Sequence, residues 1–275
     1  MSLARASRSE LTKQFTTSMW WILAIVLVAY LGATAAGLAA TFGALASGAI
    51  DQGAVNGPAL PADLLPPVIY SLATAMGYVF PLLLGTLLVT NEFRHKTLTP
   101  TFLATPRRGA ALVGKVVAGA VMGILFGALA IVATVGPGAG LLAAFDIDTR
   151  LGDSDTWAML GRMLIAFVLW SLVGVGVGTL VRNQVAAVVG VLAFTQFVEP
   201  ILRTVAAFVD GVSDVAEYLP GAASDALVGA SIYTSLAGPD TGGGLPWWAG
   251  GLLLLGYAVA LLVLGWLFSW RRDVT

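Results

Sequence analysis

Few residues in this sequence are of the types that carry out catalysis. The chain has no cysteine and a single histidine, His95. Disulfides, thiolate nucleophiles and cysteine-bound metals are therefore excluded, and a histidine metal cage cannot form. An intramembrane protease would need a serine–histidine pair or an H-E-x-x-H metal site, and His95 stands alone on a predicted loop. We therefore expect no catalytic residue, no metal ligand and no enzyme activity on this chain.

The segment 109–116 has the letters of a phosphate-binding loop. It reads Gly-Ala-Ala-Leu-Val-Gly-Lys-Val, which matches G-x-x-x-x-G-K up to the last position. That position holds Val116, where a serine or threonine is required to bind magnesium. The segment also leads into an apolar run, whereas a phosphate loop follows a β-strand. We therefore expect no nucleotide or other cofactor on this chain, and we expect Lys115 to extend its ammonium group to the membrane interface.

The elements that must position any functional residue are membrane-spanning helices. Hydrophobic residues make up 58% of the chain and charged residues only 11%, against about 25% in soluble proteins. A span needs about 20 mostly apolar residues, and six stretches meet this requirement. We predict an all-α integral membrane protein with a single transmembrane domain, 1–275, whose third span ends at Gly136-Pro137-Gly138. The predicted spans are 19–45, 67–90, 109–135, 158–181, 184–202 and 246–269.

Lysine and arginine residues give the expected orientation, because short loops rich in them stay in the cytoplasm. If both chain ends are cytoplasmic, the outer segments and outer helix ends hold only Arg150, Arg162 and Arg203 of these residues. The acidic residues of the loops fall mostly outside. The cytoplasmic set is Arg5, Arg8, Lys13, Arg94, Lys96, Arg107, Arg108, Lys115, Arg182, Arg271 and Arg272. We therefore predict six spans with both termini in the cytoplasm.

Two segments outside the spans have a distinctive pattern. Residues 3–18 combine charge with Leu11 and Phe15, which suits an amphipathic helix on the inner interface; a solvated tail is the alternative. On the outside, residues 222–236 are too few to cross the membrane and too apolar for a free loop. We expect them to form a re-entrant hairpin before the last span, covered by the other helices.

The cytoplasmic loop 91–108 is the most informative segment. Glu92 and Lys96 are spaced i, i+4 in the order that favours an ion pair on a helix. Thr99-Pro100 and Thr105-Pro106 each resemble a helix N-cap followed by a proline at the first helical position. Several apolar side chains on this polar loop need a protein surface to pack against. They are Phe93, Leu98, Phe102 and Leu103.

In this loop the chain resembles the type-2 permeases of ATP-binding-cassette exporters. The resemblance lies in Glu92-Phe93-Arg94, Lys96-Thr97, the run Thr101 to Arg108, and Lys115. It extends to the six-span layout, the leading amphipathic segment and the apolar outer stretch. The resemblance implies a subunit of an exporter in a bacterial cytoplasmic membrane, which moves a substrate out of the cell. The expected substrate is a hydrophobic drug, a lipid or a peptide, and the sequence does not choose among them.

The resemblance also implies partners. Two separate ATPase subunits would bind ATP and magnesium, and a second permease chain, identical or related, would complete the complex in the lipid bilayer. No nucleic acid is implied. The loop would form the coupling element that docks on the ATPase, whereas the alternative is that its basic residues only fix the topology. The docking set is Glu92, Phe93, Arg94, Lys96, Phe102, Leu103, Arg107 and Arg108, with Arg182 in a smaller second contact.

Ionisable residues at the outer end of the fifth span form a second candidate site. Counting along the helices places Glu199 near Arg162 of the neighbouring span, while Arg203 is a competing partner at i, i+4. The group is either a structural ion pair or part of an outer gate.

In the fourth span, Gly174 and Gly178 form a G-x-x-x-G pattern. It suits either a dimer contact or packing within one subunit.

Two other classes of function remain open from the sequence. A secondary transporter usually carries acidic residues or broken helices near the middle of the membrane, often in two matching halves. The predicted spans show neither an acidic residue at that depth nor an internal repeat. A membrane scaffold or sensor that transports nothing is equally compatible with the composition.

Overall fold

The computed structural model describes residues 3–50, 61–97, 108–206, 213–230 and 245–270. Across these ranges the secondary structure is helical, without a strand, and six helical stretches are long and apolar enough to cross a membrane. The chain is therefore a multi-pass membrane protein, as predicted. The spans are α2 (Met19–Ala46), α3 (Leu65–Gly77) with α4 (Val79–Arg94), α6 (Arg108–Ala144), α7 (Ser154–Leu180), α8 (Gln184–Ala193) with η3 (Phe194–Val198) and α9 (Glu199–Ala206), and α13 (Trp247–Gly265) with η5 (Trp266–Trp270).

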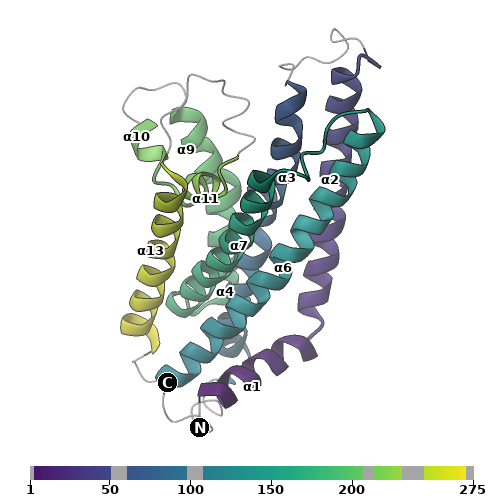
Figure 1. Ribbon diagram of the computed structural model, residues 1–275. Coiled ribbons are helices and arrows are strands. Elements are labelled where there is room, and N and C mark those ends of the chain that lie inside the picture. The colour runs from purple at the N-terminus through teal and green to yellow at the C-terminus, as the bar shows by residue number, and fades with distance from the viewer. Residues whose placement is uncertain (1–2, 51–60, 98–107, 207–212, 231–244, 271–275) are drawn as a thin grey trace.

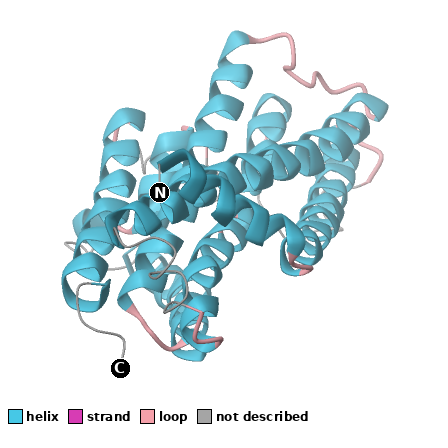
Figure 2. Ribbon diagram, turned by 90° about the horizontal axis from the view of Figure 1, so that it is seen from below, coloured by secondary structure: helices cyan, strands magenta, loops and turns pink. Residues whose placement is uncertain are grey.

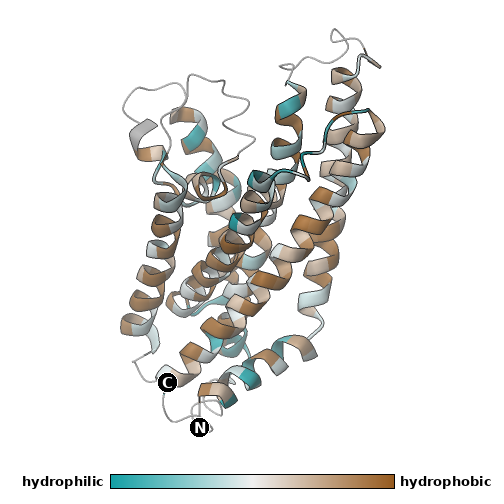
Figure 3. Cartoon of the chain, viewed as in Figure 1, coloured by the Kyte–Doolittle hydropathy of each residue, from teal (hydrophilic) through white to brown (hydrophobic). Residues whose placement is uncertain are grey.

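Short helices occupy both ends of this bundle (Figure 1). At one end, α1 (Leu3–Thr16) packs across the first turns of α6. Of the two alternatives for residues 3–18, the structure therefore shows the helix and not the solvated tail. At the other end are η2 (Ala62–Leu64), α10 (Ser213–Ala216) and α11 (Pro220–Val228). Hydrophilic residues gather at these two ends, and the helices between them are mostly apolar (Figure 3). We call the two ends the α1 end and the α11 end.

Helix α7 is the centre of the bundle, because it packs against α4, α6 and α13 (Figures 1 and 2). The second and fourth spans each bury 67% of their most apolar window, whereas the fifth and sixth bury 22% and 17%. Because exposed apolar helix faces are normal in lipid, the fifth and sixth spans form the periphery. Helix α11 packs against both α13 and α7.

Glycines allow α4 and α7 to approach closely. A Cβ on Gly178 would lie 2.6 Å from the carbonyl oxygen of Thr86, and one on Gly174 would meet that of Leu82. From the other side, Gly85 faces the backbone of Ser171 in the same way. The G-x-x-x-G pattern therefore serves packing within one subunit, which is one of the two alternatives left open by the sequence.

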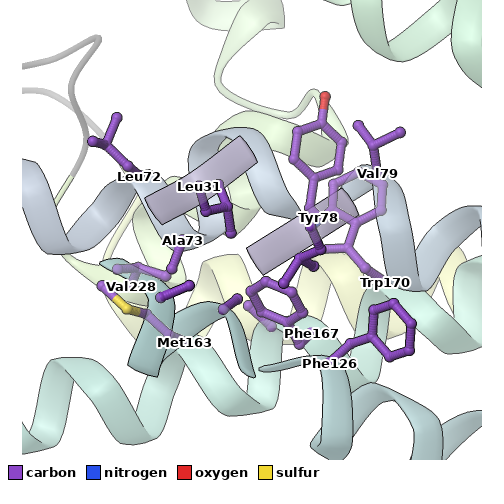
Figure 4. Close-up of a cluster of buried hydrophobic side chains, with 14 of the residues drawn as sticks. Leu31, Leu72, Ala73, Tyr78, Val79, Phe126, Met163, Phe167, Trp170 and Val228 are labelled. Atoms are coloured by element: carbon purple, nitrogen blue, oxygen red, sulfur yellow. The ribbon is translucent and has the colours of Figure 1, made fainter. Parts of the chain in front are cut away.

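A buried cluster of aromatic and aliphatic side chains holds the middle of the bundle together (Figure 4). The rings of Tyr78 and Trp170 lie 4.5 Å apart between centroids. The indole of Trp170 also donates a 3.1 Å hydrogen bond to the hydroxyl of Ser224, which satisfies its buried N–H and ties α7 to α11. This contact fixes the short helix expected in the re-entrant segment; the second arm of the predicted hairpin lies outside the described residues.

Two prolines interrupt spans as expected from their missing N–H groups. Pro81 cannot donate to the carbonyl of Gly77 four residues earlier, and the second span breaks there between α3 and α4. Before Pro200 the fifth span widens into the π-helical turn η3, an adjustment that membrane helices use to accommodate proline.

The prediction that Gly136-Pro137-Gly138 ends the third span is wrong, because α6 continues through Pro137 to Ala144. Packing beyond the proline explains the difference. A Cβ on Gly138 would come within 2.8 Å of Ile69 on α3, and Leu142 is fully buried. The contacts with α3 therefore hold the helix together where a hydrogen bond is lost.

Candidate functional site

At the α1 end, three helices meet in a tightly packed contact. Helix α1 crosses α6 at Gly114, where a Cβ would lie 3.2 Å from the backbone of Ala6. The last turn of α4 lies beside them, so that Glu92 faces both α1 and α6. Figure 2 views the bundle from this end, with the N-terminal helix in front.

Four charged side chains form a closed ring at this contact, which we call the charge ring: Glu10, Lys13, Glu92 and Lys115. The Lys13 ammonium lies 2.7 Å from Glu10 Oε1 and 2.8 Å from Glu92 Oε1. The Lys115 ammonium lies 2.9 Å from Glu10 Oε2 and 2.9 Å from Glu92 Oε2. The last of these is an ion pair without hydrogen-bond alignment. Each charge in the ring therefore has two partners of opposite sign, and the formal charges cancel.

Lys115 is the buried centre of the charge ring. The prediction that Lys115 reaches the membrane interface is wrong, because its side chain is 0% exposed. Its ammonium also donates to the carbonyl oxygen of Leu88 at 3.5 Å. Two carboxylates inside the protein offer this cation a better environment than the interface would, since a buried charge needs close partners of opposite sign.

The charges of the ring also shift the pKa values of Glu10 and Lys13, the two ring residues on α1. Burial alone would raise the pKa of Glu10, but the charge of Lys115 and the bonds from Lys13 outweigh burial and hold this pKa below 4.5. Burial would lower the pKa of Lys13, but its hydrogen bonds to Glu10 and Glu92 outweigh it and hold this pKa above 10.5. Both groups on α1 are therefore charged across the physiological pH range.

The end of α4 differs from the expectation that Glu92 pairs with Lys96. Glu92 pairs with Lys13 and Lys115 instead, and Asn91 to Arg94 belong to the helix rather than to a loop. Lys96 lies beyond the helix end at φ 54°, where its N–H donates to the carbonyl of Phe93 and the Thr97 N–H donates to that of Glu92. This pair of bonds is a Schellman helix stop, and the side chain of Lys96 is exposed.

Phe93 and Arg108, both predicted docking residues, contact the end of the last helix. The ring of Phe93 packs edge-on against Trp270 with centroids 6.3 Å apart. The Trp270 indole donates to the carbonyl of Arg108 at 3.0 Å, and the Arg108 guanidinium donates to the carbonyl of Trp270 at 3.4 Å. Phe93 therefore finds part of its packing surface within this chain. Three further docking residues, Phe102, Leu103 and Arg107, lie outside the described residues, as does Leu98.

The predicted second contact is also engaged within the chain. The Arg182 guanidinium donates to the hydroxyl and the carbonyl oxygen of Ser269, both at 3.1 Å. Arg182 thus hydrogen-bonds to a carbonyl group at the C-terminus of the last helix, where cations are favoured. The exposed Arg94 donates to the Gln184 side chain at 3.4 Å, so the end of α4 and the start of α8 lie side by side.

At the α11 end, the structure brings Glu199 together with Arg203 and with Asp225, which the sequence did not indicate. Glu199 Oε1 lies 3.4 Å from Arg203 Nε and accepts a 2.6 Å hydrogen bond from the Gly221 N–H. Arg203 Nη1 lies 2.8 Å from Asp225 Oδ2. Of the two alternatives for Glu199, the pair with Arg203 is therefore the one that forms. Arg162 instead lies 5.9 Å from the centre of the Trp247 ring.

Lys13 and Lys115, the partners of Glu92, and Glu10, which shares these two lysines, were not predicted from the sequence. Glu10 is the one acidic residue in the basic segment 3–18, and this isolated charge was the available signal. No group of three or more histidine, cysteine, aspartate or glutamate residues suited to a metal ion occurs in the described part of the chain.

Comparison with known proteins adds no further assignment. No protein-family model matches the chain, and no curated protein matches its sequence.

Proposed function

We propose that this chain is the membrane-spanning permease subunit of an ATP-driven exporter in a bacterial cytoplasmic membrane. The observation that supports the proposal best is the charge ring. It joins α1, α4 and α6 at the place where segment 98–107, the core of the predicted coupling element, leaves α4 and returns to α6. A force applied to that segment would therefore act on three helices together.

The contacts around the ring favour such a mechanical connection. On one side of segment 98–107, α4 ends in the Schellman stop and Glu92 is held by Lys13 and Lys115. On the other side, Arg108 is bonded to Trp270 of the last helix. A separate ATPase that docks on this segment and moves on ATP binding would displace α1, α4, α6 and the end of α13 as one unit, because packed elements move discretely rather than by bending.

The partners follow from the same proposal. Two ATPase subunits bind ATP and magnesium, and a second permease chain, identical or related, completes the translocation pathway. The permease itself performs no chemistry. The excess of lysine and arginine at the α1 end favours a cytoplasmic location for that end, where an ATPase would have access to it.

One observation favours a secondary transporter as the second candidate. Glu199 is 2% exposed, and it lies in a span next to the π-helical turn η3 and close to the break between α3 and α4. Buried acidic residues at broken helices are typical of transporters driven by ion gradients. An exporter of the first kind would lose transport when the ATPase is inactivated, whereas a secondary transporter would lose it when the ion gradient is collapsed.

A pull-down from native membranes tests the proposed function. The tagged chain is purified in mild detergent and co-purifying proteins are identified. We expect an ATPase with the wild-type chain and little of it with the double variant Phe102→Ala, Leu103→Ala. The matched control is Phe197→Ala, which removes an exposed phenyl group from the fifth span. Absence of any ATPase from the wild-type preparation would contradict the exporter proposal.

A further inference from the structure

A small cavity lies at the α11 end, where the α3–α4 junction, α9 and α11 meet. It encloses about 280 Å³ of space including its open mouth, and the centre of a water-sized group can occupy about 20 Å³ of it. About 10–15 Å³ is enough for one water molecule, so the interior accepts one small polar group. The lining residues are Ala75, Tyr78, Glu199, Pro200, Arg203, Gly221 and Asp225.

Glu199 offers this cavity a carboxylate oxygen that the protein leaves unused. Its Oε1 atom is engaged by the Gly221 N–H and by Arg203. Its Oε2 atom is buried and has no hydrogen-bond partner among the described residues. A buried polar atom in this condition is uncommon in folded proteins, and a bound water, ion or ligand group would satisfy it.

The charges around the cavity indicate the sign of that group. Two carboxylates, Glu199 and Asp225, face one guanidinium, that of Arg203. Arg203 is the single lysine or arginine between positions 203 and 246, a segment that also contains Asp210, Asp214, Glu217, Asp225 and Asp240. Arg162 lies over Trp247, and the Tyr257 hydroxyl donates to the carbonyl of Tyr218. By formal charge, the residues that line the cavity therefore carry one negative charge in excess.

We propose that this cavity binds the primary ammonium group of a cationic amphiphile, and that such amines are cargo of the permease. The assignment of cargo rests on the proposed function, whereas the binding site does not. An ammonium group supplies the positive charge that would balance the lining residues, donates a hydrogen bond to Glu199 Oε2 and is close to water in size. A trimethylammonium group is larger and donates no hydrogen bond, so the same cavity excludes it. The rest of the amphiphile extends through the open mouth.

A binding measurement on the full chain in nanodiscs of phosphatidylcholine tests this site without any ATPase. Three probes are compared by calorimetry: benzylammonium, benzyltrimethylammonium and neutral benzyl alcohol. For the wild-type chain we expect benzylammonium to bind at least about tenfold more tightly than either other probe, since a charge-assisted hydrogen bond distinguishes them.

Matched variants identify the carboxylates responsible. Glu199→Gln keeps an oxygen to accept from the Gly221 N–H, and we expect it to abolish the preference for benzylammonium. Asp225→Asn, in a different helix, should reduce the preference. Glu217→Gln, which removes a carboxylate of the same region that does not line the cavity, should leave it intact. Thermal unfolding in the same nanodiscs shows whether each variant is folded.

Three outcomes would overturn the proposal. They are equal binding of all three probes to the wild-type chain, an unchanged preference in folded Glu199→Gln, and displacement of benzylammonium by an equal concentration of sodium ion. The last would assign the site to inorganic cations. If benzylammonium binds as expected but no ATPase is found with the chain, the site stands and the proposed exporter function fails.

Discussion

The Lys115 ammonium and the Glu92 carboxylate lie 2.9 Å apart, and their side chains are 0% and 8% exposed. One residue comes from the first turns of α6 and the other from the last turn of α4. Because Glu10 and Lys13 of α1 complete the charge ring, this ion pair connects the ends of two spans to the amphipathic helix. The ring is the feature on which the proposed coupling depends.

Replacing Lys115 by methionine should strongly destabilise the protein. The substitution leaves the buried carboxylates of Glu10 and Glu92 with Lys13 as their remaining partner in the ring. Removing one member of a buried ion pair typically costs about 3–5 kcal/mol, which should appear as a large drop in the unfolding midpoint in detergent. The control Lys96→Met alters an exposed lysine and should change the midpoint little. Equal midpoints for the two variants would contradict the buried ring.

The attachment of α1 to the bundle should depend on pH at both extremes. The pKa of Glu10 is held below 4.5, so its contribution is present above pH 4.5 and is lost as pH falls through the lowered value. The pKa of Lys13 is held above 10.5, so its contribution is present below pH 10.5 and is lost as pH rises through the raised value. A spin label at Ser9→Cys should therefore show constant mobility between these limits and greater mobility outside them. A transition near neutral pH would be inconsistent with this assignment.

The close packing of α4 and α7 predicts that alanine at two glycines changes the free energy of unfolding differently. A methyl group on Gly174 would meet the backbone of Leu82, whereas one on Gly190 meets nothing within 4 Å. Gly174→Ala should lower the free energy of unfolding by about 1–3 kcal/mol, as overpacking does. Gly190→Ala should leave it unchanged or raise it by up to about 1 kcal/mol, because alanine favours the helix. Unfolding midpoints of the two variants provide the comparison, and tolerance of Gly174→Ala would argue against this helix contact.

The spans could be predicted from the sequence because hydropathy is a local property. Their ends were less predictable, since tertiary contacts decide them. Pro137 has the local character of a helix end, yet the packing of Gly138 and Leu142 against the neighbouring helices carries α6 onward. The break at Tyr78 has a local cause in Pro81, which the sequence displays.

The charge ring could not be predicted because its members come from three separate segments. Lys115, read alone, is a lysine near the start of a span, for which the membrane interface is the default position. Only the crossing of α1 over α6 at Gly114 brings Glu10 to it. At the α11 end the i, i+4 spacing of Glu199 and Arg203 was readable, whereas Asp225 enters through the fold of α11.

The orientation inferred from basic residues is open to a direct labelling test. The chain has no native cysteine, so a single introduced cysteine reports its own side of the membrane. Asp153→Cys, at the α11 end, should react with a membrane-impermeant maleimide on intact cells. His95→Cys, exposed at the α1 end, should react only after the cells are permeabilised. The reverse pattern would place the α1 end outside and remove the basis for ATPase docking.

Site-specific crosslinking from segment 98–107 tests whether an ATPase subunit docks on this segment. A benzophenone maleimide is attached to Phe102→Cys in native membranes, and the membranes are irradiated. Mass spectrometry then identifies the crosslinked adduct. Asp63→Cys, at the opposite end of the bundle, is the control. The proposed function predicts that Phe102→Cys forms an adduct with an ATPase subunit and that Asp63→Cys does not. Adding Leu103→Ala, which should weaken ATPase binding, should abolish the Phe102→Cys adduct. Adducts with lipid or with unrelated proteins alone, from a well-labelled Phe102→Cys chain, would contradict the proposed function.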